Sequence, residues 1–209
     1  MVVLLLAAVM GYLLGSLSFA VIVSRWFKLP DPHSYGSGNP GATNVLRSGS
    51  KKAAVVTLIG DAGKGVVAVL LAIAIERQWG GGSAVIALAG LFAFLGHLYP
   101  VFFGFRGGKG VATAAGILIA IDWRVGLAVL AIWIGMALVF RISSLSALCA
   151  ALAAPLVAYA LGLDQFERIA IVLMSLLLIA RHRSNLQRLL SGEEGRIDAK
   201  GQGGSTPGA

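Results

Sequence analysis

The chain has 209 residues, of which 57% are apolar and only 12% charged, and its formal net charge is +8. Soluble domains usually carry about 25% charged residues, so this composition argues against a soluble protein. The basic residues stand mainly between apolar runs with few aromatic neighbours, so we expect no nucleic-acid partner. The single cysteine, Cys149, lies within an apolar run, which excludes an intrachain disulfide, and no Cys/His spacing indicates a metal site.

Seven apolar runs predict an all-α, polytopic membrane protein. They cover residues 2–24, 53–75, 85–98, 111–121, 125–140, 145–162 and 168–180. A spanning helix needs about 20 apolar residues, so the short third and fourth runs must borrow polar flanks, cross a thinned bilayer or be re-entrant. We predict seven transmembrane helices, some of them short, with six or five as alternatives. The first run lacks a basic region before it, so we interpret it as a retained span rather than a signal peptide.

The distribution of basic residues predicts the orientation. With the N-terminus outside, the inner segments 25–52, 99–110, 141–144 and 181–190 hold eleven Lys and Arg residues, whereas the outer segments hold three. Cytoplasmic loops carry the Lys/Arg excess, so we place the N-terminus outside and the C-terminus in the cytoplasm. Residues 1–192 are then one membrane-embedded domain. Residues 193–209, rich in Gly, Ser and charge, are expected to be a disordered cytoplasmic tail.

The first inner loop has the composition of an anion-binding loop. Its glycines permit turns that other residues resist, so that successive N–H groups can form a concavity for an anion. Arg47 adds a planar guanidinium suited to phosphate. The candidate ligands are Ser37, Gly38, Asn39, Thr43, Asn44 and Arg47. A plain Gly/Asn/Pro turn is the alternative interpretation.

The second inner loop contains a Gly-Gly-Lys-Gly sequence just before a candidate helix. Backbone N–H groups at that helix start, together with Gly107, Gly108 and Lys109, predict a second anion site. The sequence is not a Walker A loop, because the spacing before Gly108-Lys109 is one residue short and no Ser or Thr follows the lysine. Nucleotide hydrolysis is therefore not expected.

Two charged residues lie inside the second predicted span. Asp61 and Lys64 are three positions apart, so they share a helix face. Ionisable residues within a span are costly and are candidates for a functional site, which makes Lys64 a candidate substrate ligand. The alternatives are an ion pair that only stabilises helix packing, or a position nearer the inner surface.

Further candidates lie at other inner segments. Ser143, in the turn after Arg141, either binds substrate or caps the next helix. His182 and Asn185 are three apart, so a helix can present both toward one site. His97 adjoins the Gly-Gly-Lys loop and is the best of the three histidines for proton transfer at neutral pH.

These motifs together resemble the bacterial membrane acyl-phosphate:glycerol-3-phosphate acyltransferase family. The matching segments are Gly36–Arg47, Asp61–Gly65, Gly96–His97 with Phe105–Thr113, and Arg181–Arg188. The resemblance spans about residues 11–192. The family commonly has Lys where this chain has Arg106, which keeps the charge.

The resemblance implies a seven-span fold in the bacterial inner (cytoplasmic) membrane, with its active site on the cytoplasmic side. It implies transfer of a fatty acyl group from acyl phosphate to the sn-1 hydroxyl of glycerol 3-phosphate, giving lysophosphatidic acid and phosphate. This reaction opens phospholipid biosynthesis. The expected partners are both substrates, membrane lipid and a peripheral enzyme that makes acyl phosphate, and no cofactor is expected.

The chemistry assigns catalytic roles to His97, Lys109, Ser37 and Arg47. Acyl phosphate is already activated, so direct attack without an acyl-enzyme suffices, and several cations and amides are needed to hold two phosphates together. No histidine is followed by Asp five residues later, so the His-x4-Asp dyad of other glycerolipid acyltransferases is absent. We therefore expect a substrate phosphate oxygen to accept the hydroxyl proton, with His97 as the alternative base.

Two other functions remain open at this point. The first is an acyltransferase that uses a thioester donor, which needs room for a carrier or coenzyme. The second is a transporter of an anionic metabolite, which predicts charged groups at mid-membrane and access from both sides. The polar motifs gather on the inner side, with Asp61 and Lys64 as the one exception.

Overall fold

The computed structural model describes residues 1–197, and every regular element within that range is a helix. This confirms the all-α prediction. The elements in chain order are α1 (Val2–Gly15), α2 (Phe19–Trp26), α3 (Ala42–Leu46), α4 (Lys51–Trp79), α5 (Ser83–Leu98), the 3-10 turn η1 (Val101–Phe103), α6 (Val111–Ile121), α7 (Trp123–Phe140), α8 (Ser143–Ala160), α9 (Gln165–Arg181) and α10 (Arg183–Leu190).

Five helical segments of the described chain are long and apolar enough to cross a membrane. They are Val2–Trp26, Lys51–Trp79, Ser83–Phe103, Trp123–Phe140 and Ser143–Ala160. A sixth is added if α9 and α10, which are bent by 57° relative to each other, form one broken span. The remaining apolar helix, α6, has 11 residues and is shorter than a spanning helix. All seven predicted runs are helical, but the predicted count of seven spans is not confirmed.

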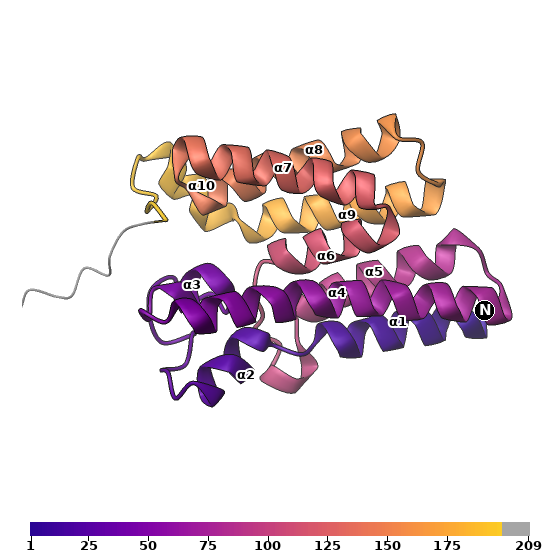
Figure 1. Ribbon diagram of the computed structural model, residues 1–209, viewed down its shortest axis with the longest axis horizontal. Helices are drawn as coiled ribbons and strands as arrows, with labels where there is room; N and C mark the ends of the chain where they lie inside the picture. Colours follow the sequence, from indigo (N-terminus) through magenta and orange to yellow (C-terminus); the bar gives the residue numbers. More distant parts are fainter. Residues whose placement is uncertain (198–209) are drawn as a thin grey trace, which may run out of the picture.

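The helices form a bundle in two groups with α6 between them (Figure 1). In one group α1 packs along α5, and α4 packs against both. In the other group α8 packs between α7 and α9. Helix α6 joins the groups through contacts with α4 and α7. Helices α3 and α10 lie at one end of the bundle, which we call the α3/α10 end, and the N-terminus lies at the other (Figure 1).

The first apolar run is broken into α1 and α2 at Ser16–Ser18. The Ser16 hydroxyl donates a hydrogen bond to the Tyr12 carbonyl at 2.8 Å, a local bond that competes with the helix. Ser18 is extended, and the ammonium of Lys64 on α4 donates to the Leu17 carbonyl at 2.7 Å. A lysine from another helix thus satisfies a carbonyl that the break leaves without a helical partner.

Small residues let the helices approach closely at two crossings. A Cβ on Gly11 of α1 would lie 2.3 Å from the Ala89 carbonyl oxygen of α5. A Cβ on Gly116 of α6 would lie 2.0 Å from the Ala62 carbonyl oxygen of α4. Such small-residue contacts drive helix association in membranes, where burial of apolar surface contributes little. The second crossing fixes the middle of α6 against α4.

One face of α8 consists of buried alanines. They are Ala147, Ala150, Ala151 and Ala154. Because alanine fills little volume, this face leaves space toward α6, α7 and α9. Apolar residues from those helices, including Leu118, Val129 and Met174, line the same space. This apolar groove becomes part of the site below.

Candidate active site

The first inner loop is wound around one buried side chain, Asn44. Its amide nitrogen donates to the carbonyls of Pro32 at 2.8 Å and Tyr35 at 3.2 Å, and its amide oxygen accepts from the Ser37 backbone N–H at 2.9 Å. Gly36, at φ +57°, lies so close that a Cβ would meet the Asn44 oxygen at 2.2 Å. Asn44 therefore gives the loop its shape, while Ser37 and Arg47 reach the cavity described below.

The second inner loop is fixed from two sides. The Gly108 N–H donates to the His97 carbonyl at 3.2 Å. From the other side, the Arg181 guanidinium donates to the carbonyls of Gly107 at 3.0 Å and Gly108 at 3.2 Å. The same guanidinium lies 5.5 Å from the centre of the Tyr99 ring, a cation–π contact. This arrangement directs the next residue, Lys109, into the cavity.

Lys109 is the cation most affected by its surroundings. Its ammonium donates to the Asn185 amide oxygen. Burial lowers the pKa of Lys109 to about 8, and the nearby guanidinium groups of Arg188, Arg181 and Arg47 lower it further, while Glu194 acts in the opposite direction. Four positive groups close together repel one another, and an anion bound among them would relieve that repulsion, so the place is suited to an anion.

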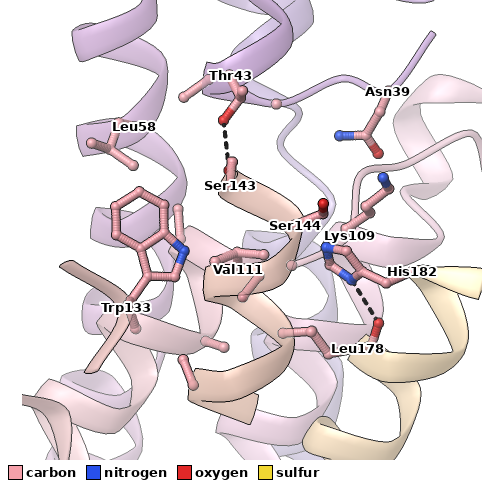
Figure 2. A pocket seen from close by; sticks show the side chains of 18 of the residues that line it. Asn39, Thr43, Leu58, Lys109, Val111, Trp133, Ser143, Ser144, Leu178 and His182 are labelled. Carbon is pink, nitrogen blue, oxygen red and sulfur yellow. Dashed lines mark hydrogen bonds between the residues drawn. The ribbon is translucent and has the colours of Figure 1, made fainter. Parts of the chain in front are cut away.

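The bend between α9 and α10 brings a third group of polar side chains to the same place. His182, at the bend, is held by a 2.8 Å hydrogen bond between its Nδ1 and the Leu178 carbonyl (Figure 2). Burial would raise the pKa of Glu194, but hydrogen bonds from Ser144, Asn185 and Arg188 outweigh burial and lower it. The Glu194 carboxylate therefore closes a ring of polar contacts with α8 and α10.

The three polar segments surround one cavity of about 890 Å³. Its mouth lies between the first inner loop with α3, Lys109 and α10, and the Thr43 and Ser143 hydroxyls lie 3.3 Å apart at its edge (Figure 2). Its inner part is the apolar groove along α8. Leu58 of α4 and Trp133 of α7 both line the cavity (Figure 2). Leu58 is 49% exposed, so the groove reaches the outer surface of α4.

Ten of the predicted site residues line this single cavity. They are Ser37, Asn39, Thr43, Asn44, Arg47, His97, Lys109, Ser143, His182 and Asn185. Four others do not line it: Gly38, Lys64, Gly107 and Gly108. Gly38 donates its N–H to the Tyr35 carbonyl, Lys64 contacts Asp61 and Leu17, and the two loop glycines contact His97 and Arg181. The geometry gives these four a supporting position behind the site.

Sequence reasoning assigned no site role to several residues that line the cavity. Glu194, Gly195, Arg196 and Ile197 come from the predicted tail 193–209, and residues 198–209 of that tail lie outside the described part of the chain. The tail has the composition of a disordered segment, so its sequence gives no sign that its first residues line the cavity. Arg188 belonged to a recognised motif, whereas Trp133 and the α8 alanines look like ordinary apolar residues of a span, and no local signal marks them.

Comparison with known proteins identifies the family. A family model described as glycerol-3-phosphate acyltransferase matches residues 5–192. The glycerol-3-phosphate acyltransferase of Thiobacillus denitrificans is 58% identical, covering 92% of this chain and 96% of the relative. That of Neisseria meningitidis is 54% identical, covering 93% of this chain and 97% of the relative.

Two solved structures share the fold. The crystal structure of PlsY (YgiH), an integral membrane glycerol 3-phosphate acyltransferase, in its glycerol 3-phosphate form has 39% identity and a TM-score of 0.86, covering 92% of this chain and 94% of that chain. The lysophosphatidic acid form has 38% identity and a TM-score of 0.84, with the same coverage. With several apolar helices of spanning length, this chain is a multi-pass membrane protein, and it belongs to the glycerol-3-phosphate acyltransferase family.

Proposed function

We propose that the protein transfers a fatty acyl group from acyl phosphate to the sn-1 hydroxyl of glycerol 3-phosphate, producing lysophosphatidic acid and inorganic phosphate. The observation that carries this proposal is the cavity itself, which joins a cationic, amide-lined mouth to an apolar groove. One substrate is a small water-soluble phosphate, and the other is a phosphate attached to an apolar chain. The two parts of the cavity match the two kinds of substrate.

The apolar groove is suited to the acyl chain. It is lined by the small α8 side chains and by Leu118, Leu130, Trp133 and Met174. Because it reaches the exposed surface of α4 at Val55 and Leu58, a chain dissolved in the bilayer has a lateral route into it. Entry from the bilayer spares the chain exposure to water, which costs about 0.8 kcal/mol for each methylene group.

The cationic mouth is suited to two phosphates. Arg47 and Lys109 line it together with the amides of Asn39 and Asn185 and the Ser37 hydroxyl. We assign these groups to holding both phosphates and to stabilising the negative charge that develops on the attacked carbonyl oxygen. Well-oriented reactants can lower a barrier by about 7–11 kcal/mol, so positioning alone accounts for a large part of the catalysis.

The reaction needs no protein nucleophile. The glycerol 3-phosphate hydroxyl oxygen attacks the carbonyl carbon and forms the ester bond, while the bond between that carbon and the phosphate oxygen breaks. Inorganic phosphate leaves with the electron pair, and we assign the hydroxyl proton to a substrate phosphate oxygen. His97 is the alternative acceptor, since it also lines the cavity.

We further propose that the α3/α10 end faces the cytoplasm of a bacterial inner membrane. Glycerol 3-phosphate is charged and reaches the mouth from water, and the basic residues concentrate in the segments at this end. A peripheral enzyme that makes acyl phosphate is the partner expected to supply the donor.

A donor assay tests the proposed function. Purified protein is given glycerol 3-phosphate with acyl phosphate, acyl-CoA or acyl carrier protein in separate reactions, and lysophosphatidic acid is measured. We expect product with acyl phosphate and none with either thioester. A thioester donor needs room for its carrier or coenzyme, whereas the mouth holds the phosphate of glycerol 3-phosphate and is bordered by residues 194–197. Product only with a thioester would establish the alternative donor and reject the acyl-phosphate proposal.

A further inference from the structure

Three buried ionisable groups meet beneath the site, at the crossing of α4, α5 and α6. Asp61, Lys64 and His97 are 2%, 5% and 7% exposed. The Lys64 ammonium lies 2.9 Å from Asp61 Oδ1, and His97 Nδ1 lies 3.5 Å from the same oxygen. His97 Nδ1 also lies 3.1 Å from the Thr113 hydroxyl oxygen. Buried charges are costly unless they are paired, so this cluster requires a reason for its presence.

Lys64 belongs to this cluster rather than to the mouth of the cavity. Its second contact is the Leu17 carbonyl in the break between α1 and α2, and it does not line the cavity. Lys64 therefore links the broken first span to Asp61. The predicted pairing of Asp61 and Lys64 on one helix face is confirmed by their ion pair.

His97 connects the cluster to the second inner loop by two contacts. Its backbone carbonyl accepts the Gly108 N–H at 3.2 Å. Its ring packs directly on Gly108, because a Cβ added to that glycine would lie 2.3 Å from Nε2. Nδ1 thus faces Asp61 and Thr113, while Nε2 faces the backbone of the loop. The residue after Gly108 is Lys109, the cation of the mouth.

We infer that Asp61, Lys64 and Thr113 form a positioning network that fixes the His97 ring, and through that ring the shape of the loop that presents Lys109 to a substrate phosphate. In this role His97 is a positioning residue and not the base. The inference rests on the proposed function in one respect, namely that Lys109 binds a substrate phosphate. It adds a role for the paired charges within the span, of which Lys64 does not line the cavity and Asp61 lines it but is engaged by Lys64 and His97.

The first test removes both charges of the pair at once. In the Asp61→Asn/Lys64→Met double variant no unpaired charge is left buried, and the one bond lost besides the ion pair is that from Lys64 to the Leu17 carbonyl. We expect a folded protein of somewhat lower thermal stability in detergent, because the Leu17 carbonyl loses its donor, and a fall in kcat/KM of about 100-fold, mostly as a raised KM for glycerol 3-phosphate. The matched control is Thr57→Val, one turn away on α4 and fully buried, which should leave the kinetics unchanged. A folded double variant with wild-type KM would overturn the inference.

The second test separates a positioning histidine from a base. An Asn side chain can place its amide near the position of Nδ1 and keep the bond to Thr113, but it cannot accept a proton as imidazole does. Asn does not reach Gly108 as the imidazole Nε2 does, and Gln does not keep the Nδ1 contacts, so we expect both His97→Asn and His97→Gln to raise the KM for glycerol 3-phosphate while kcat keeps the wild-type pH profile. If both variants lost kcat equally with unchanged KM, and the wild-type kcat titrated near neutral pH, His97 would be the base and the inference would fail.

A binding measurement separates this inference from the proposed donor. Calorimetric titration of purified protein with glycerol 3-phosphate needs no acyl donor. We expect the double variant to bind about tenfold or more weakly than the wild type, because a misplaced Lys109 loses part of its contact with the phosphate. This result would support the network even if acyl phosphate were not the donor. Equal affinities, or no binding by the wild type, would overturn it.

Discussion

At the scale of single residues, Lys109 makes the site sensitive to pH in the alkaline range. Its pKa is lowered to about 8, chiefly by burial. The ammonium is charged below that value and loses its proton as the pH rises through it. Glycerol 3-phosphate is already a dianion there, since the second pKa of a phosphate monoester is about 6.

We therefore predict that the KM for glycerol 3-phosphate is nearly constant below pH 8 and rises above it, approaching about tenfold per pH unit. Steady-state kinetics between about pH 6.5 and 9.5 measure this. The control is Lys109→Arg, whose guanidinium stays charged throughout, so its KM should be higher than that of the wild type but flat with pH. A wild-type KM that stays flat above pH 8 would show that the charge on Lys109 does not hold this substrate.

Glu194 is the residue whose charge stabilises the ring of polar contacts at the mouth. Its carboxylate accepts hydrogen bonds from Ser144 at 2.6 Å, Asn185 at 2.5 Å and Arg188 at 2.7 Å. We predict that Glu194→Gln lowers the free energy of unfolding by about 1.5–3 kcal/mol at neutral pH, the usual range for hydrogen bonds to a charged group. Thermal unfolding in detergent gives the measurement.

The pH dependence of this effect has a definite sign. Because the folded pKa of Glu194 lies below 4.5, its contribution is present above the ordinary value and is lost as the pH falls through the folded value. The difference between wild type and Glu194→Gln should therefore narrow in acid. The neighbouring exposed residue supplies the control, and Glu193→Gln should have little effect. Equal stability of the two variants would argue against the ring of contacts.

Most polar residues of the mouth were predictable, because they lie in Gly-rich loops between apolar runs and these loops have the composition of an anion-binding site. Their separate roles were not. Asn44 and Lys109 look equivalent as candidate ligands in the sequence. In the structure the Asn44 amide makes three hydrogen bonds with backbone groups of its own loop, whereas Lys109 projects into the cavity. Which loop atoms a side chain reaches depends on the folded loop and not on composition.

At the scale of the elements, hydropathy located every long apolar helix, because a continuous stretch of apolar residues is a local property of the chain. The break at Ser16–Ser18 and the bend at His182 could not be predicted in this way. The carbonyl freed at Leu17 is satisfied by Lys64, which lies 47 positions away. A hydropathy average over neighbouring residues cannot reveal breaks that depend on such distant partners.

The α1–α5 crossing is an element contact that a single methyl group tests. A Cβ on Gly11 would meet the Ala89 carbonyl oxygen at 2.3 Å, and that atom belongs to helix backbone which cannot turn aside. Alanine is the better helix former by about 1 kcal/mol, so local propensity and packing oppose each other. We predict that packing dominates and that Gly11→Ala lowers the stability in detergent by about 1–3 kcal/mol.

Gly63→Ala is the matched control for this prediction. Gly63 also lies inside a helix, α4, but a Cβ there would have no neighbour within 4 Å. Only the higher helix propensity of alanine changes the stability there, so this variant should be as stable as the wild type or more stable. Thermal unfolding of both variants under one detergent condition compares them directly. If Gly11→Ala matched Gly63→Ala, the close approach of α1 and α5 would be disproved.

At the scale of the whole molecule, the length of α4 provides a test of which end of the bundle faces the cytoplasm. Helix α4 runs the length of the bundle, from the α3/α10 end to the opposite end (Figure 1). Lys52 in its first turn and Gln78 near its last residue are both exposed. At 1.5 Å per residue they are roughly 39 Å apart along the axis, more than the bilayer core of about 30 Å. These two positions should therefore lie on opposite sides of the membrane.

The charge distribution and the substrate make the same prediction for this pair. The basic inner segments lie at the Lys52 end, and glycerol 3-phosphate, which is charged, must reach the mouth from water at that end. With Cys149 replaced by Ser, we expect a membrane-impermeant maleimide to label Gln78→Cys in intact cells. Lys52→Cys should be labelled only in inverted membrane vesicles. Labelling in the reverse pattern would place the cationic mouth outside, where neither the positive-inside rule nor a cytoplasmic phosphate substrate could account for it.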